Sequence, residues 1–139
     1  MSQTKSPLPR EVADAYVDEL IALDPVLGTY LGVQESHGRL PDTSPAGQEA
    51  VAELARVTLA RLDEAERRPG ADRDIERRCG RLLRERLTAA LAVHDAGEGL
   101  RSVGNLHTAA HSVREVFTLT PTETAEDWAT VAELSLIHI

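Results

Sequence analysis

Hydrophobic residues recur every three or four positions along most of this chain, which is the period of an amphipathic helix. Over residues 9–23, Pro9 and Glu11 suit the first turn of a helix. The apolar positions that follow are Val12, Ala13, Tyr16, Val17, Leu20, Ile21 and Leu23. They predict a first helix over about 9–23 with one broad buried face.

The stretch 24–45 interrupts this pattern with prolines and glycines. Asp24-Pro25 combines a capping residue with proline at the first helical position, so a short helix is predicted to begin there and to end at Gly32. We expect Tyr30 and Leu31 to dock this helix against the rest of the protein.

Residues 33–43 lack any hydrophobic period, and we predict an irregular loop in which His37 to Asp42 is ordered. Ser44-Pro45 repeats the capping signal and opens a helix that stops before Pro69-Gly70. Its predicted apolar face consists of Ala50, Val51, Leu54, Val57, Leu62 and Ala65.

A long helix is predicted over about 72–96, ended by Gly97 and Gly99. Its apolar face would consist of Ile75, Cys79, Leu82, Leu83, Leu87, Ala90, Leu91 and His94. A short helix should follow from about Thr108 to Phe117.

Thr124 and Asp127 predict a capped start for a last helix that contains Trp128, Val131 and Leu134. No alternating run of strand length occurs anywhere in the sequence, so we predict an all-α fold.

Composition and charge narrow the possible partners. The net charge of −8 and the pI near 5.1 argue against a nucleic-acid partner, which needs a concentrated basic face. No apolar run reaches about 18 residues and the N-terminus has no apolar segment, so we expect no membrane partner and a cytoplasmic location. The single cysteine, Cys79, excludes an internal disulfide and a cysteine-based metal site, and an inert buried thiol is expected.

The histidines offer the few candidates for chemistry. His107 and His111 have the four-residue spacing of a helical zinc site, and Glu115 could add an oxygen ligand. However, Thr108 stands where a metallopeptidase has its glutamate, so a polar helix start is the favoured interpretation. His94 is expected to be a core histidine bonded to a carboxylate or carbonyl, and His37 a loop residue. No residue of this sequence is assigned as catalytic, cofactor-binding or metal-binding.

Three segments carry a resemblance to one bacterial family. They are AYVDELIALDPVLGTYLGVQESHGRLPDTSP (15–45), RLLRERLTAALAVHDAGEGLR (81–101) and SVREVFTLTPTETAEDWATVAE (112–133). In their order and spacing they resemble the family called domain of unknown function 885. The most distinctive piece is D-P-x-x-G/A-T-x-x-G followed by R-L-P-D-x-S-P.

Members of that family are longer, largely helical proteins that resemble zinc-dependent metallopeptidases of the zincin type. Their H-E-x-x-P-G-H-H-like motif lies in a C-terminal half that this sequence lacks. The resemblance therefore implies an N-terminal helical segment of a larger zincin-like fold, with zinc and a peptide substrate expected only for the intact protein. It carries no catalytic residue over to this sequence.

The resemblance also suggests how the chain is organised. We expect a disordered leader over 1–8 and the N-terminal helical part of one larger domain over 9–133, whose partner is the missing C-terminal portion of the same chain. Residues 134–139, LSLIHI, resemble a translated sequencing adapter and are expected to be an artefact. The alternative is a stand-alone helical protein-interaction domain with no enzymatic activity.

Overall fold

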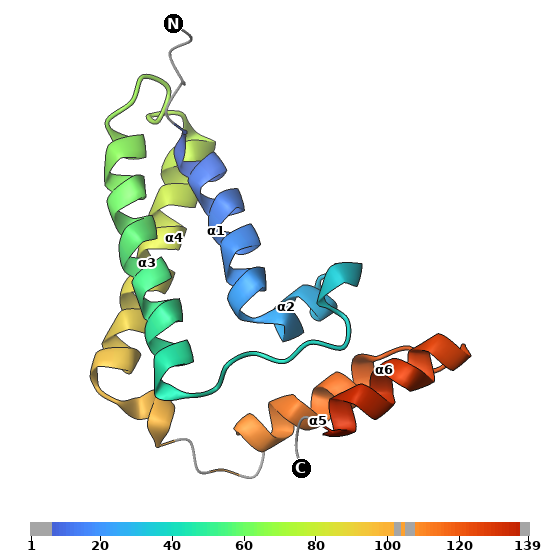
Figure 1. Cartoon of the computed structure of the whole chain (residues 1–139). Helices are drawn as coiled ribbons and strands as arrows, with labels where there is room; N and C mark the ends of the chain where they lie inside the picture. The colour runs from blue at the N-terminus through green and yellow to red at the C-terminus, as the bar shows by residue number, and fades with distance from the viewer. Residues whose placement is uncertain (1–6, 102–103, 105–107, 137–139) are drawn as a thin grey trace, which may run out of the picture. The chain divides into compact units, whose positions relative to one another are not determined.

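The computed structural model describes residues 7–101, 104 and 108–136, and over these residues the protein contains helices and no strand (Figure 1). The predicted all-α fold class is confirmed. The α-helices are α1 (Pro9–Leu23), α2 (Pro25–Tyr30), α3 (Pro45–Glu66), α4 (Asp74–Asp95), α5 (Ala109–Leu119) and α6 (Ala125–Leu136). Two 3₁₀ turns, η1 (Gln34–Ser36) and η2 (Glu98–Leu100), lie between them.

The chain forms two compact units. Unit 1 combines the chain up to Leu20 with Gln48–Gly99, and unit 2 combines Ile21–Gly47 with the chain from Leu100 onward. None of the described helices is both long enough and apolar enough to cross a membrane.

Capping side chains determine where several helices begin. The Asp24 carboxylate accepts a hydrogen bond from the Leu27 amide at 3.3 Å, and Pro25 occupies the first helical position. At α6, the Thr124 hydroxyl accepts from the Asp127 amide (3.1 Å) while the Asp127 carboxylate accepts from the Thr124 amide (2.8 Å). This reciprocal pair is a capping box, as the sequence predicted.

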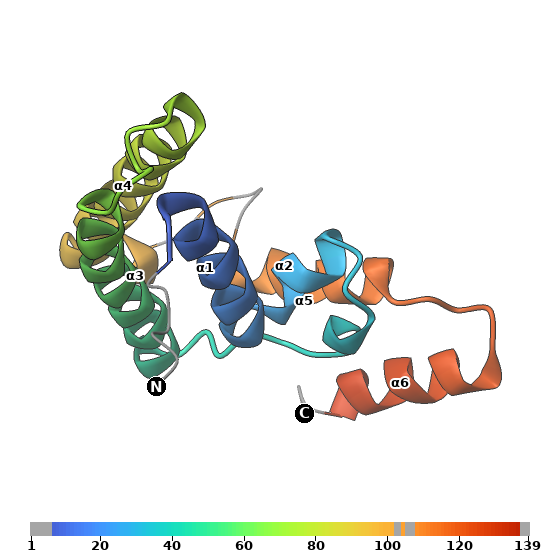
Figure 2. The same cartoon turned by 90° about the horizontal axis from the view of Figure 1, so that it is seen from above.

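Unit 1 is built from α1, α3 and α4, which lie alongside one another in both views (Figures 1 and 2). Their apolar faces share one core, made of Val12, Ala55, Leu62, Ala65, Leu83 and Leu87. Burial of these side chains is the main source of the unit's stability.

The predicted apolar face of α4 is partly wrong. Ile75 and Leu82 are 57% and 56% exposed, whereas Glu76 and Gly80 are buried. The cause is a specific polar contact: the Glu76 carboxylate accepts a hydrogen bond from the Arg10 amide at 3.0 Å, in the first turn of α1. This contact satisfies a helix-terminal amide that has no partner within its own helix. In the same unit, Val57 of α3 and Ala90 of α4 are exposed rather than buried.

Unit 2 contains α2, η1, α5 and α6. Its core cluster consists of Val26, Val116 and Leu134, with Leu40 and Phe117 packed against it. The stretch 24–45 thus contributes Val26 of α2 to this small core and Leu40 to its edge.

Tyr30 and Leu31 are each 57% exposed, so burial of these side chains does not dock α2 as expected, although the Tyr30 hydroxyl donates a hydrogen bond to Glu115 of α5. The buried positions of α2 are Pro25, Val26 and Gly28. Gly28 lets η1 approach closely, because a β-carbon placed there would lie 2.0 Å from the Ser36 hydroxyl. Ser36 is itself only 1% exposed.

Several sequence-based predictions concern the ends of the chain. Of the predicted leader, the described residues are Pro7 and Leu8, and the Leu8 amide donates to the Glu11 carboxylate at 2.6 Å. Leu134 is 1% exposed, α6 continues to Leu136, and residues 137–139 lie outside the described residues. The domain boundaries and the assignment of 134–139 as an artefact stay predictions.

Candidate functional site

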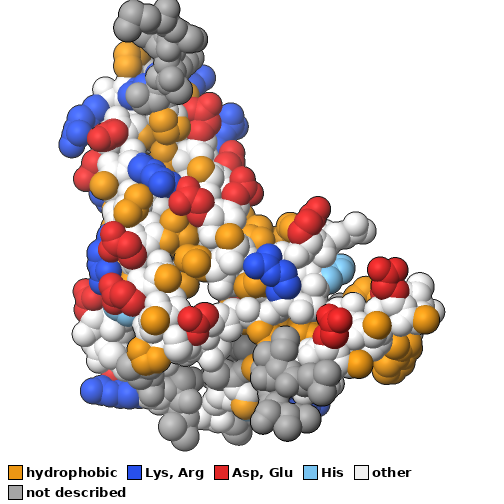
Figure 3. Space-filling model, in the orientation of Figure 1, with side chains coloured by type: hydrophobic (Ala, Val, Ile, Leu, Met, Phe, Trp, Pro, Cys, Tyr) orange, Lys and Arg blue, Asp and Glu red, His pale blue; other side chains and the backbone are white. Residues whose placement is uncertain are grey.

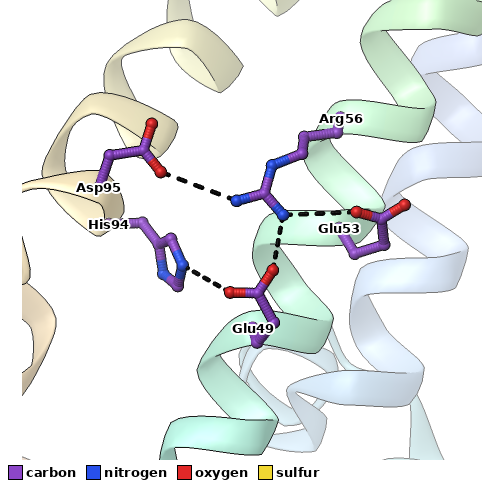
Figure 4. Close-up of polar contacts among 5 residues, drawn as sticks. All are labelled: Glu49, Glu53, Arg56, His94 and Asp95. Carbon is purple, nitrogen blue, oxygen red and sulfur yellow. Dashed lines mark hydrogen bonds and ion pairs between the residues drawn. The ribbon is translucent and has the colours of Figure 1, made fainter.

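The richest polar cluster among the described residues joins α3 to the last turn of α4 in unit 1 (Figure 4). The His94 ring nitrogen Nε2 lies 2.9 Å from Glu49 Oε2. The other oxygen of Glu49 accepts a hydrogen bond from Arg56 at 2.7 Å. The Arg56 guanidinium also lies 3.3 Å from Glu53 and 3.7 Å from Asp95, so it bridges the two helices.

The electrostatics of this cluster favour a fixed, ionised Glu49. Hydrogen bonds from Arg56 and then from His94 lower the pKa of the Glu49 carboxyl, and the bond to Glu49 raises the pKa of Arg56. The side chains are solvated: His94 is 27% exposed and Glu49 56%. The pairs therefore position the helix ends and contribute little to stability.

His94 also lines a small cavity of about 80 Å³ in unit 1. The lining residues are Tyr16, Gln48, Val51, Ala52, Ala55, Ala90, Leu91 and His94. This lining contains no serine, threonine or cysteine nucleophile, and burial raises the pKa of the Tyr16 phenol. A space of this size holds only a few water molecules. The geometry suits a polar link between α3 and α4 better than an acid–base site.

The expectation for His94 is confirmed in its chemistry, since its partner is a carboxylate, although the ring is half-buried rather than part of the core. The sequence did not identify Glu49 as its partner, nor Arg56 as the second partner of Glu49. Their seven-residue spacing places both on one face of α3, which is the signal that could have identified them.

The candidate zinc ligands near α5 are engaged in other contacts. His111 Nδ1 lies 2.8 Å from the Thr108 hydroxyl, and the Glu115 carboxylate accepts a hydrogen bond from the Tyr30 hydroxyl, which raises the Tyr30 pKa. His107 lies outside the described residues. Over the part of the chain that the structure describes, no three histidine, cysteine or carboxylate side chains are grouped to hold a metal ion.

Cys79 is half-buried instead of fully buried. Desolvation raises the pKa of its thiol, and the charges of Glu76 and Asp14 raise it further. Because the thiolate is the reactive form, this environment makes the thiol less reactive, in line with the expected inert role.

Comparison with protein families identifies the chain. A family model described as "Bacterial protein of unknown function (DUF885)" matches residues 25–135. The chain belongs to this family. The comparison with curated proteins finds no match.

The DUF885 match begins at Pro25, within the segment that carried the resemblance, and the structure explains the residues of that segment. Asp24 caps α2, and Gly28 admits Ser36 at close range. Gly32 has a φ of +79°, a left-handed conformation that other residues adopt only with strain. These contacts and this backbone conformation account for Asp24, Gly28 and Gly32 in this chain.

Proposed function

We propose that this DUF885 chain forms the N-terminal helical part of a zinc-dependent peptidase or peptidase-like hydrolase. The observation that carries the proposal is the family match over residues 25–135, because the family resembles zincin-type metallopeptidases. The all-α build of the described residues agrees with the mostly helical character of that fold.

In this proposal the helices of the chain form part of the wall of the substrate channel, and the chain supplies no metal ligand. The described residues do not fit a zinc ion, because His111 is paired with Thr108 and Glu115 with Tyr30. Zinc, held by residues outside this sequence, would activate water for attack on a peptide carbonyl. What the present helices contribute is a wall for the substrate channel.

The test is to express the gene product together with any in-frame continuation of its gene beyond codon 133. We expect this protein to bind zinc and to cleave peptides in a broad library, and the 139-residue chain alone to cleave none. A protein that binds no zinc and cleaves no peptide would refute the proposal.

The alternative is a stand-alone helical interaction domain. The observation that favours it is in unit 2, where Tyr30, Leu31 and Trp128 are 57%, 57% and 58% exposed, because exposed aromatic side chains are enriched at protein interfaces. Cooperative unfolding of residues 1–133 as a monomer, together with a stop codon soon after codon 133, would support the alternative. A continuation that encodes H-E-x-x-P-G-H-H would exclude it.

A further inference from the structure

We propose that a pocket at the turn between α3 and α4 binds a small molecule that carries a phosphate group. The pocket has a volume of about 430 Å³ and lies wholly within unit 1. Its lining, called here the arginine pocket, consists of Glu66, Arg68, Ala71, Asp72, Arg77, Arg81 and Arg84. This volume is within the usual range of small-molecule sites.

The lining of the arginine pocket is richer in arginines than in carboxylates. It contains four arginines and two carboxylates, and Asp63 and Asp74, which lie outside the lining, pair with Arg84 and Arg77. Arg77, Arg81 and Arg84 recur at spacings of four and three residues, so they share one face of α4. Figure 3 shows basic side chains around the end of unit 1 that carries this turn, with acidic ones among them.

Two of the four guanidinium groups already have protein partners. Arg84 lies 2.7 Å from both Asp63 and Glu66, which raises its pKa, and Arg77 lies 3.0 Å from Asp74. These ion pairs hold the two side chains in place at the rim of the pocket.

The other two guanidinium groups are available to a ligand. Among the described residues, Arg81 has no side-chain partner, and one terminal nitrogen of Arg68 is buried without a hydrogen-bond acceptor. A buried charged donor without an acceptor is costly, and each such group in a native protein calls for a partner such as a water or an ion. An oxyanion in the pocket would supply that acceptor.

Phosphate suits this arrangement better than other small ligands. A guanidinium presents its donors in a planar fork that matches phosphate oxygens in pairs, and charge-assisted bonds of this kind are the strong ones. The two guanidinium groups without a carboxylate partner among the described residues, those of Arg68 and Arg81, match the two charges of a phosphate dianion, whereas a single carboxylate carries one. The proposal does not depend on peptidase activity.

The test is an NMR titration of the full 139-residue chain at constant ionic strength, with the arginine Nε–Hε signals as the readout. The probes are inorganic phosphate, phenyl phosphate as a phosphate monoester, and citrate as a carboxylate. We expect saturable shifts of the Arg68 and Arg81 signals with inorganic phosphate or with the monoester. The tighter of these two probes shows whether the ligand is free phosphate or an ester.

Two substitutions on one helix give a matched comparison. Arg81→Gln removes an unpaired guanidinium from the pocket and should weaken phosphate binding about tenfold or more. Arg86→Gln changes an exposed arginine outside the lining and should leave binding unchanged. As a second variant, Arg68→Lys keeps the charge, loses the fork and should also weaken binding.

Three results would overturn the proposal. They are the absence of any saturable shift, equal weakening by Arg81→Gln and Arg86→Gln, and citrate binding as tight as that of both phosphate probes.

Discussion

Replacing Gly28 with alanine tests the close packing of α2 on η1 in unit 2. The added β-carbon would lie 2.0 Å from the Ser36 hydroxyl oxygen, 2.8 Å from the Ser36 β-carbon and 2.7 Å from a methyl carbon of Ile21. The hydroxyl can rotate away, but the two carbon contacts require the backbone or the Ile21 side chain to shift. Overpacking of this kind costs roughly 1–3 kcal/mol.

Alanine also has a higher helix propensity than glycine, which offsets the loss by at most about 1 kcal/mol. We therefore expect Gly28→Ala to lower the free energy of unfolding of unit 2 by about 1–2 kcal/mol. Urea unfolding followed by tryptophan fluorescence measures this change, because Trp128, the chain's single tryptophan, lies in α6 of unit 2.

Two further variants identify the mechanism. Ser36→Gly in the Gly28→Ala background removes two of the three close contacts and should recover part of the lost stability. Gly32→Ala is the matched control. Gly32 has a φ of +79°, and a β-carbon added there would have no atom within 4 Å. The loss of stability in this variant is therefore backbone strain, which Ser36→Gly cannot relieve. A Gly28→Ala protein as stable as the original would refute the close packing.

Two other predictions concern carboxylates that cap helices. Glu76→Ala removes the acceptor of the Arg10 amide and should lower the free energy of unfolding of unit 1 by about 1–3 kcal/mol. Glu76→Gln keeps an acceptor oxygen and should lower it less. Urea unfolding followed by circular dichroism measures both changes. Equal losses in the two variants would show that the hydrogen bond is not the cause. Hydrogen bonds from Thr124 and then from Glu123 lower the pKa of Asp127. The stabilisation of α6 by the Asp127 carboxylate is therefore complete above the usual carboxyl pKa and is lost as the pH falls through the lowered value. A carboxyl ¹³C titration should find its midpoint below the usual aspartate range together with fraying of α6 in acid, and a midpoint at or above that range would contradict the capping box.

Helix starts were predictable because they depend on local chemistry. Asp24-Pro25 and Ser44-Pro45 place α2 and α3 at the predicted residues. The start of α4 differs by two residues, at Asp74 instead of about 72, because its N-cap is Arg73, whose side chain makes no capping bond. A helix start without a capping signal is difficult to place from sequence.

Buried faces were less predictable where a long-range polar contact decides them. Periodicity places Ile75 on the core side of α4, yet the buried position is Glu76, whose partner Arg10 is 66 residues away. In α2, the large side chain of Tyr30 suggested that it docks the helix, yet Tyr30 is exposed. The close contact is made at Gly28 instead, because a β-carbon there would collide with Ser36.

In the candidate site, too, local features could be predicted from the sequence and long-range partners could not. His94 could be identified from its place on α4, and a carboxylate partner could be expected, but Glu49 lies 45 residues away on another helix. The arginine pocket escaped the sequence reasoning because Arg68 lies in a turn and joins the α4 arginines only after the chain has folded.

The most direct test of the proposed function is the zinc content and peptidase activity of the gene product with any in-frame continuation, measured in one preparation. We expect about one zinc ion per chain and peptide cleavage that stops when a chelator removes the zinc and resumes when zinc is restored. A folded product that contains no zinc and leaves a broad peptide library intact would contradict the proposed function.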